Sequence, residues 1–104
     1  VLVVCDDFHL PLGRLRCRRK GSAGGQKGLA HTLERLPEQD VARLRCGIGE
    51  PGRVPAETFV LQPFRRGERP EVDELVDRAA NHLASWLDHR DLDRLINEAN
   101  APRP

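Results

Sequence analysis

Residues 14–36 read RLRCRRKGSAGGQKGLAHTLERL, and their hydrophobic period changes at the glycines from that of a strand to that of a helix. Before the glycines, Leu15 and Cys17 alternate with arginines, which predicts a half-buried strand. After them, apolar residues recur at helical spacing as far as Leu36, and Pro37 is expected to end the helix. A strand, a glycine turn and an amphipathic helix in this order are typical of an α/β fold.

Further strands are predicted on either side of this unit. The apolar run at 1–5 predicts a buried interior strand that ends in a polar turn at Asp6 and Asp7. Residues 43–49, RLRCGIG, alternate like a second half-buried strand whose arginines point outward. Residues 58–64, TFVLQPF, predict a short strand.

The last third of the sequence has helical periodicity. Pro70 is expected to begin the longest helix, which covers one face of a sheet with a wide apolar stripe. The stripe comprises Val72, Leu75, Val76, Ala79, Ala80, Leu83, Trp86 and Leu87. A short helix is predicted over residues 92–99. The predicted fold class is therefore α/β, a small mixed sheet with helices packed on it, in a single domain over residues 1–104.

Charge is nearly balanced over the chain but is concentrated locally. Seventeen Lys and Arg residues stand against sixteen Asp and Glu residues, for a formal net charge of +1. Residues 14–20 nevertheless carry five cationic side chains and no acid. This indicates either a face that binds a polyanion or an edge strand that its charges keep soluble. Aromatic residues make up 4% of the chain, so base stacking is not expected to dominate recognition.

The spacing of histidines, cysteines and glycines argues against metals and cofactors. The four histidines are scattered, so no metal site is expected. The three cysteines lie far apart with no CxxC pair, which indicates reduced thiols used as small core residues. The glycine turn lacks the spacing of a nucleotide-binding loop, which disfavours a nucleotide cofactor. No apolar run reaches the length that a membrane span needs.

The glycine turn and Asp6, at the end of the first predicted strand, each allow two interpretations. Gly21, Gly24 and Gly25 let the backbone approach a ligand and leave N–H groups free at a helix N-terminus, which suits an anion or a carbonyl. Alternatively, they only reverse the chain between strand and helix. Asp6 is placed either to orient a histidine or to cap nearby amides.

Cations are predicted to gather beside the turn. Arg16 and Arg18 are expected to project from one face of their strand, Arg45 from a neighbouring strand, and Lys20 stands where the turn begins. Such a group is suited to a cluster of phosphates, for example at a nucleic-acid end.

Together, these segments resemble the bacterial-type peptidyl-tRNA hydrolase family over nearly the whole chain. Residues 3–29, VVCDDFHLPLGRLRCRRKGSAGGQKGL, are similar to that family's Asp-Asp or Asp-Glu strand end, Leu-Pro loop, basic strand and Gly-Ser-Ala-Gly-Gly turn. Residues 43–52, RLRCGIGEPG, resemble its Arg-Leu-Arg-Ile-Gly-Ile-Gly strand and loop. Residues 59–64, FVLQPF, resemble its Tyr-Val-Leu-Ser-Pro-Phe segment.

The resemblance implies an enzyme that cleaves the ester between a stalled peptide and its tRNA, which recycles tRNA for translation and ribosome rescue. It implies a cytoplasmic protein that is a monomer when complete and uses no metal or cofactor. By this match, Asp6 orients the catalytic histidine. The residues that border the substrate cleft are Gly24, Gly25, Gln26 and Lys27. The cations that match the clamp on tRNA phosphates, or stand beside it, are Arg16, Arg18, Lys20 and Arg45.

Two departures from the family pattern bear on activity. The family's first half, with its Gly-Asn-Pro-Gly loop and catalytic histidine, is absent, and this sequence contains no Met and opens inside a strand pattern. We therefore expect an N-terminally incomplete chain that is inactive alone. In addition, Gln26 and Lys27 stand where the family commonly has His-Asn. The alternatives are a hydrolase-like RNA-binding protein without catalysis, or an inactive fragment.

Overall fold

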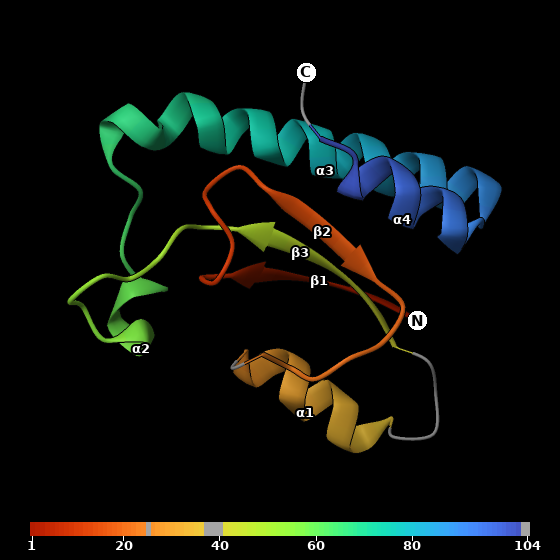
Figure 1. The fold of residues 1–104 in the computed structure, drawn as a ribbon, viewed down its shortest axis with the longest axis horizontal. Helices are drawn as coiled ribbons and strands as arrows, with labels where there is room; N and C mark the ends of the chain where they lie inside the picture. The colour runs from red at the N-terminus through yellow and green to blue at the C-terminus, as the bar shows by residue number, and fades with distance from the viewer. Residues whose placement is uncertain (25, 37–40, 103–104) are drawn as a thin grey trace.

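A mixed sheet forms the centre of the chain. The computed structural model describes residues 1–24, 26–36 and 41–102, and within them the sheet has three strands. These are β1 (Leu2–Asp7), β2 (Leu15–Arg18) and β3 (Ala42–Gly47), in the order β1-β3-β2. β1 is parallel to β3 and β2 is antiparallel to it, so the predicted small mixed sheet is confirmed (Figure 1).

The register of the strands gives the sheet one cationic face. Arg16 lies opposite Arg45, and Arg18 lies opposite Arg43, across the β2–β3 pair. Because side chains alternate along a strand, these four arginines share one face and the apolar residues between them share the other. The predicted alternation of the β2 strand is confirmed, with Leu15 almost fully buried.

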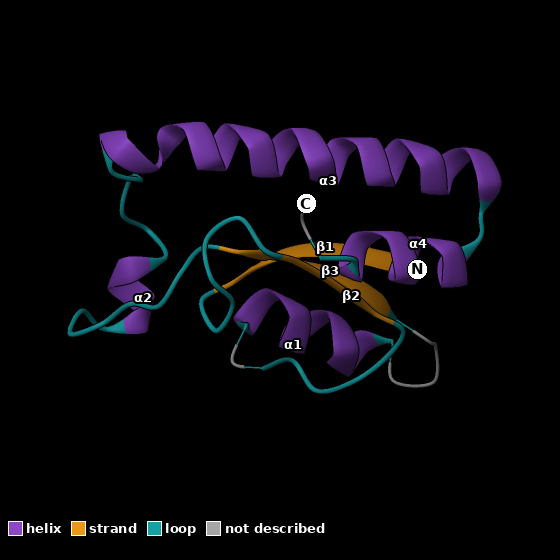
Figure 2. Cartoon of the chain, turned by 45° about the horizontal axis from the view of Figure 1, so that its top comes forward, coloured by secondary structure: helices purple, strands orange, loops and turns teal. Residues whose placement is uncertain are grey.

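Helices cover both faces of this sheet (Figure 2). Helix α1 (Lys27–Arg35) lies on one side, and α3 (Arg69–His89) and α4 (Leu92–Asn100) lie on the other. The predicted long helix is confirmed, with Pro70 in its first turn, where a missing backbone N–H costs nothing. The N-cap residue of the short last helix is Asp91, whose carboxylate accepts a hydrogen bond from the Arg94 N–H at 3.1 Å.

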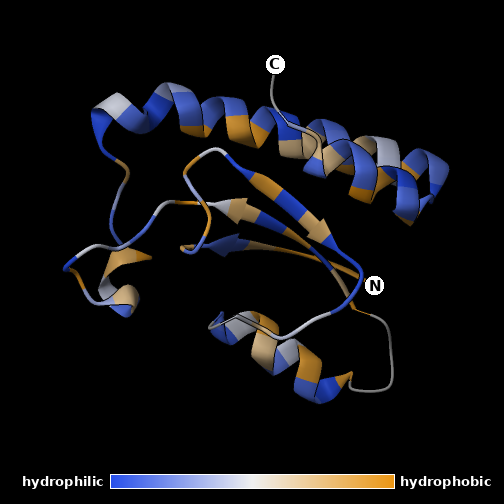
Figure 3. Cartoon of the chain, in the orientation of Figure 1, coloured by the Kyte–Doolittle hydropathy of each residue, from blue (hydrophilic) through white to orange (hydrophobic). Residues whose placement is uncertain are grey.

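The main core lies between the apolar sheet face and helices α3 and α4. Figure 3 shows the hydrophobic residues of α3 on the side nearer the strands. The buried members of this core are Leu15, Cys17, Leu44, Leu75, Ala79, Leu95 and Ala99. The stripe on α3 is narrower than predicted, because Val76 is 58% exposed and Leu87 is 56% exposed.

An asparagine at the end of α4 pairs with the outer edge of β2. Asn100 accepts a hydrogen bond from the Cys17 N–H at 2.6 Å and donates one to the Cys17 carbonyl at 2.9 Å. A side-chain amide therefore satisfies backbone groups that the edge of the sheet leaves unpaired. This contact fixes α4 against the sheet.

Two predicted strands differ from the structure. Residues 58–64 form no strand: α2 (Ala56–Phe59) begins after Pro55 and is followed by turns and the short helix η1 (Arg66–Glu68). β1 continues through Asp7 instead of ending before it, because its pairing with β3 extends that far. Within the described sheet β1 lies at the edge, with Val4 49% exposed, so the second neighbour expected of an interior strand is not among the described strands. The predicted helix end at Pro37 lies outside the described residues.

The cysteines are free thiols, and Cys17 is fully buried, as a small core residue would be. Burial, reinforced by the nearby Cys5 and Asp6, raises the pKa of Cys46 to about 11. Cys46 is therefore a protonated and weakly nucleophilic thiol at neutral pH.

None of the helices in the described ranges is both long and apolar enough to cross a bilayer.

Gly47 is the point where the loop after β1 packs on the end of β3. Its N–H donates to the Arg14 carbonyl at 2.7 Å, and a Cβ built on it would lie 2.1 Å from the Pro11 carbonyl oxygen. A side chain at this position must push the loop off the strand.

We expect Gly47→Ala to lower the free energy of unfolding by about 2–4 kcal/mol, because backbone and not a flexible side chain occupies the space. Urea denaturation of the 104-residue chain measures this. Gly67→Ala is the matched control, since a Cβ there meets nothing within 4 Å and its φ is not in the left-handed region. Equal stability of the two variants contradicts this packing.

Candidate functional site

The carboxyl end of β1 opens into a cleft of about 420 Å³, here called the β1 cleft. It lies between the start of α1 and helix α2. The residues that line it are Asp6, Asp7, Phe8, Gly24, Gln26, Lys27, Gly28, Arg45, Ala56, Glu57, Val60 and Leu61. Five residues predicted from the sequence therefore meet here: Asp6, Gly24, Gln26, Lys27 and Arg45. Gly25 lies outside the described residues.

Gln26 joins the start of α1 to Asp6. As the N-cap residue, Gln26 has extended backbone angles, and its Oε1 accepts a hydrogen bond from the Leu29 N–H at 2.6 Å. Its Nε2 donates to Asp6 Oδ1 at 3.2 Å. The helix N-terminus and the strand end are thus connected through one side chain, and the carboxylate is held at the wall of the cleft.

Arg43 anchors the glycine turn from beneath. Its side chain is 1% exposed, and its guanidinium donates to the carbonyls of Gly21 at 2.7 Å, Ser22 at 2.9 Å and Val41 at 2.8 Å. Burial, followed by the nearby charge of Arg45, lowers the pKa of Arg43 from its usual value. Because backbone carbonyls solvate this cation, the turn is held over the sheet with its carbonyls pointing inward.

Arg45 is a second anchor, which corrects the prediction that it projects outward. It is 9% exposed, and it donates to the Ser22 carbonyl at 2.9 Å and contacts Asp7 Oδ2 at 3.4 Å. The physical reason is that β3 is the central strand and the glycine turn folds over its arginines. Gly24, at φ +61°, allows this approach, since a Cβ there would lie 3.0 Å from Arg45 Nη1.

The other predicted cations line a second hollow of about 360 Å³, here called the cationic groove. Arg16, Arg18 and Lys20 contribute to it, with Arg16 partly buried and the other two exposed. The cationic groove and the β1 cleft share Asp7, Gly24 and Arg45 in their walls. A molecule that occupies both therefore passes over the glycine turn.

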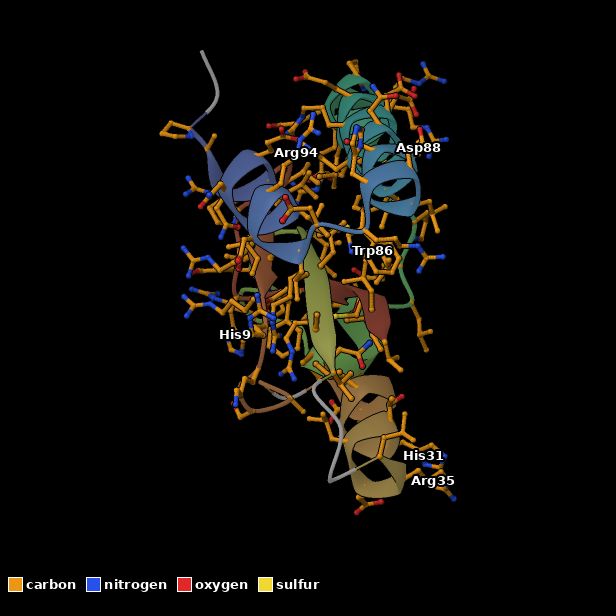
Figure 4. All side chains as sticks on the ribbon, turned by 90° about the vertical axis from the view of Figure 1, so that its right-hand side faces the viewer. His9, His31, Arg35, Trp86, Asp88 and Arg94 are labelled. Carbon is orange, nitrogen blue, oxygen red and sulfur yellow. The ribbon has the colours of Figure 1, made fainter. Side chains whose placement is uncertain are left out.

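The histidines lie elsewhere, and none is among the residues lining the β1 cleft. Figure 4 shows His9 and His31 on separate parts of the structure. His31 pairs with Arg35 on α1, His89 contacts the Ser85 carbonyl on α3, and the His9 ring packs 4.5 Å from Phe8. Within the described ranges, no group of three or more His, Cys, Asp or Glu residues could hold a metal ion.

Two polar residues of the site were not predicted. Asp7 is 8% exposed, accepts a hydrogen bond from the His9 N–H at 2.8 Å and faces Arg45, so it turns the chain after β1. The sequence predicts Arg43 only as one of the outward arginines of its strand, whereas the structure buries it. The alternation around Leu44 places both arginines on one face, but nothing in it shows that a distant segment covers that face.

The geometry defines an α/β protein in which charged, amide and apolar side chains line a cleft at a strand end, with a cationic groove beside it. The family model described as peptidyl-tRNA hydrolase matches residues 1–104. The chain belongs to the peptidyl-tRNA hydrolase family.

Individual relatives agree with this assignment. The peptidyl-tRNA hydrolase of Synechococcus sp. (strain CC9311) is 50% identical over 104 aligned positions, covering 80% of this chain and 50% of the relative. That of Lacticaseibacillus casei (strain BL23) is 36% identical over 100 positions, covering 96% of this chain and 54% of the relative. The chain spans about half the length of the curated relatives it matches.

Solved structures confirm the predicted fold class. The peptidyl-tRNA hydrolase of Acinetobacter baumannii superposes with a TM-score of 0.83 at 28% identity, covering 99% of this chain and 52% of that structure. An arginine-to-glutamine variant of the A. baumannii enzyme gives a TM-score of 0.86 at 27% identity, with the same coverage.

We expect Arg43→Met to destabilise the chain by about 2–4 kcal/mol, because it removes the guanidinium donors to the Gly21 and Val41 carbonyls and leaves the Ser22 carbonyl with Arg45 alone. Amide hydrogen exchange of residues 21–24 should accelerate by more than that of β3. Exposed Arg53→Met is the control. Unchanged protection of the turn in Arg43→Met contradicts the anchoring role.

Proposed function

We propose that the full-length product of this gene hydrolyses the ester of peptidyl-tRNA, and that this chain supplies one wall of the active site and the tRNA-binding groove. The observation that carries the proposal is the position of Asp6. It is the residue before the last one of β1 and lines the cleft, hydrogen-bonded to Gln26 and next to the cationic groove, in a chain that belongs to the peptidyl-tRNA hydrolase family.

The chemistry needs a water molecule, a base and an acid that orients the base. The water oxygen attacks the carbonyl carbon of the ester, the bond from that carbon to the ribose oxygen breaks, and the base returns a proton to the ribose oxygen. Asp6 Oδ1 accepts from Gln26, while its Oδ2 has no hydrogen-bond donor among the described residues. Asp6 is therefore available to accept an imidazole N–H and to stabilise the imidazolium that forms.

The histidine base is proposed to come from outside these 104 residues. Support for this comes from the β1 cleft, whose described lining includes no imidazole, and from relatives that are about twice as long as the match. A carboxylate at neutral pH is a weak base toward water, so Asp6 does not replace the histidine. We propose that the chain by itself binds part of the peptidyl-tRNA but does not hydrolyse its ester efficiently.

The cationic groove is proposed to bind tRNA phosphates. Arg16, Arg18 and Lys20 line its rim, and the buried Arg45 lies in its wall. Phosphate contacts of this kind orient a nucleic acid without reading its sequence. Because the groove meets the β1 cleft at Gly24, a tRNA end held there would place its ester near Asp6. We place this activity in the cytoplasm, in a monomer that uses no metal or cofactor.

In the full-length product, Asp6→Asn should lower kcat by roughly 100-fold or more and change KM little, because an amide stabilises neither the imidazolium nor the required tautomer. The assay is release of N-blocked amino acid from aminoacyl-tRNA. Asp88→Asn, on the exposed surface of α3 (Figure 4), is the matched control and should be unaffected.

Wild-type kcat in Asp6→Asn contradicts the role of Asp6. A wild-type product that binds tRNA tightly without hydrolysing the ester overturns the enzymatic proposal and favours the RNA-binding alternative. Robust turnover by the isolated 104-residue chain contradicts a base supplied from outside it.

The double variant Arg16→Ala/Arg18→Ala should weaken tRNA binding and reduce the slope of log K against log salt by about two units, because each arginine that binds a phosphate contributes roughly one unit to that slope. Fluorescence anisotropy at several salt concentrations measures both quantities. The control is Arg53→Ala/Arg66→Ala, which removes equal charge from exposed positions outside the groove. Equal slopes for the two double variants contradict the groove as the tRNA site.

A further inference from the structure

We propose that Gln26 is a positioning residue that sets the orientation of the Asp6 carboxylate, an inference that rests on the proposed function. Two contacts carry it. Gln26 Oε1 accepts from the Leu29 N–H at 2.6 Å, and Gln26 Nε2 donates to Asp6 Oδ1 at 3.2 Å. One amide thus caps a helix and fixes a carboxylate.

The hydrogen bond from the Leu29 N–H determines which atom of the Gln26 amide faces Asp6. A backbone N–H is a donor only, so the atom of Gln26 that faces Leu29 must be the carbonyl oxygen. The NH₂ group then faces Asp6, whose ionised carboxylate is an acceptor only. The amide cannot flip without losing both hydrogen bonds, and Asp6 Oδ1 therefore always meets a donor.

The backbone of Gln26 is held as well as its side chain. Its N–H donates to the Ala23 carbonyl at 3.2 Å, and its carbonyl accepts from the Ala30 N–H at 3.0 Å. Arg43 and Arg45 both donate to the Ser22 carbonyl, next to the Ala23 carbonyl that holds the Gln26 N–H, so hydrogen bonds connect Gln26 to the sheet. Little conformational entropy remains to be lost when Asp6 is oriented.

Glutamine is an unusual N-cap residue, and the length of the Gln26 side chain indicates a second role. Asn, Asp and Ser are the preferred N-cap residues, and Gln is not one of them. The additional methylene of Gln26 lets its Nε2 reach Asp6 while its Oε1 still caps α1. A cap by itself does not need this length, so we attribute the length to the contact with Asp6.

The two oxygens of the Asp6 carboxylate therefore have different partners. Oδ1 is held by Gln26, which leaves Oδ2 for the imidazole of the proposed base. The charged groups that share the cleft are Asp7, Lys27, Arg45 and Glu57. They are present in every variant described next; the positive charges of Lys27 and Arg45 favour an ionised carboxylate at position 26, and the negative charges of Asp7 and Glu57 disfavour it.

Two substitutions separate the cap from the orientation of Asp6. Gln26→Asn keeps an amide oxygen for the Leu29 N–H but is one methylene too short for Asp6. Gln26→Glu keeps an acceptor for the cap but places a carboxylate oxygen, in place of the NH₂, against Asp6. Gln62, an exposed glutamine outside the described lining of the β1 cleft, provides matched controls as Gln62→Asn and Gln62→Glu.

In the full-length product, both Gln26 variants should lower kcat by about 10–100-fold with KM nearly unchanged, because a misaligned Asp6 misplaces the base. The ratio of Gln26→Glu to wild-type kcat should rise as the pH falls toward about 4–5, because protonated Glu regains a donor for Asp6. A helix cap by itself predicts no such recovery. Wild-type kcat in both variants, or a ratio that does not change with pH, overturns the inference.

A second measurement does not depend on activity. In the 104-residue chain, the side-chain NH₂ resonances of Gln26 should shift on Asp6→Ala and stay in place on Asp88→Ala. If these resonances do not respond to Asp6, the contact is absent and the inference fails, whatever the enzyme does. If the contact is present but wild type shows no hydrolysis, the proposed function has failed and the contact itself stands.

Discussion

Two guanidinium groups buried under a glycine turn hold the site together. Arg43 and Arg45 lie on the central strand, and their donors are used by the carbonyls of the turn and by Asp7. Burying a cation is costly unless each donor finds an acceptor, so the turn cannot leave the sheet without exposing unsatisfied charge. Gly24 is required because a Cβ would press on Arg45. The turn is therefore a rigid platform, and α1 begins at a fixed place.

The remaining features of the site follow from that platform. With the start of α1 fixed, Gln26 reaches both the Leu29 N–H and Asp6, and the β1 cleft has a defined polar wall. The same sheet face carries four arginines with two different roles. The two on β3 are covered and act as anchors, whereas Arg16 and Arg18, on the outer strand β2, line the cationic groove. Position in the sheet, and not residue type, determines which arginines are covered by the turn and which line the groove.

Much of this fold could be predicted from local pattern. The periods of the hydrophobic residues in β2, α3 and α4 show which face of each element is buried. The glycines mark the turn between β2 and α1. The strand prediction for residues 58–64 failed because a short apolar run is compatible with a helix or a strand, and a strand needs a partner that is not visible locally. The outward prediction for Arg45 failed for the same reason: its burial depends on a turn 22 residues away in the sequence. Asp6, Gln26 and Lys27 line one cleft, and the sequence identifies them as candidates, but the hydrogen bond between Asp6 and Gln26 depends on tertiary placement.

The most direct test of this account is proton exchange at the arginine guanidinium N–H groups, followed by NMR in the 104-residue chain. Arg43 and Arg45 are predicted to give slowly exchanging signals, because their guanidinium groups are buried and bonded to the turn. Arg16 and Arg18 are predicted to exchange faster and to shift when tRNA is added, while Arg43 does not shift. Fast exchange at all four arginines, or a tRNA-induced shift at Arg43 equal to that at Arg18, would contradict the division into anchors and binding groups.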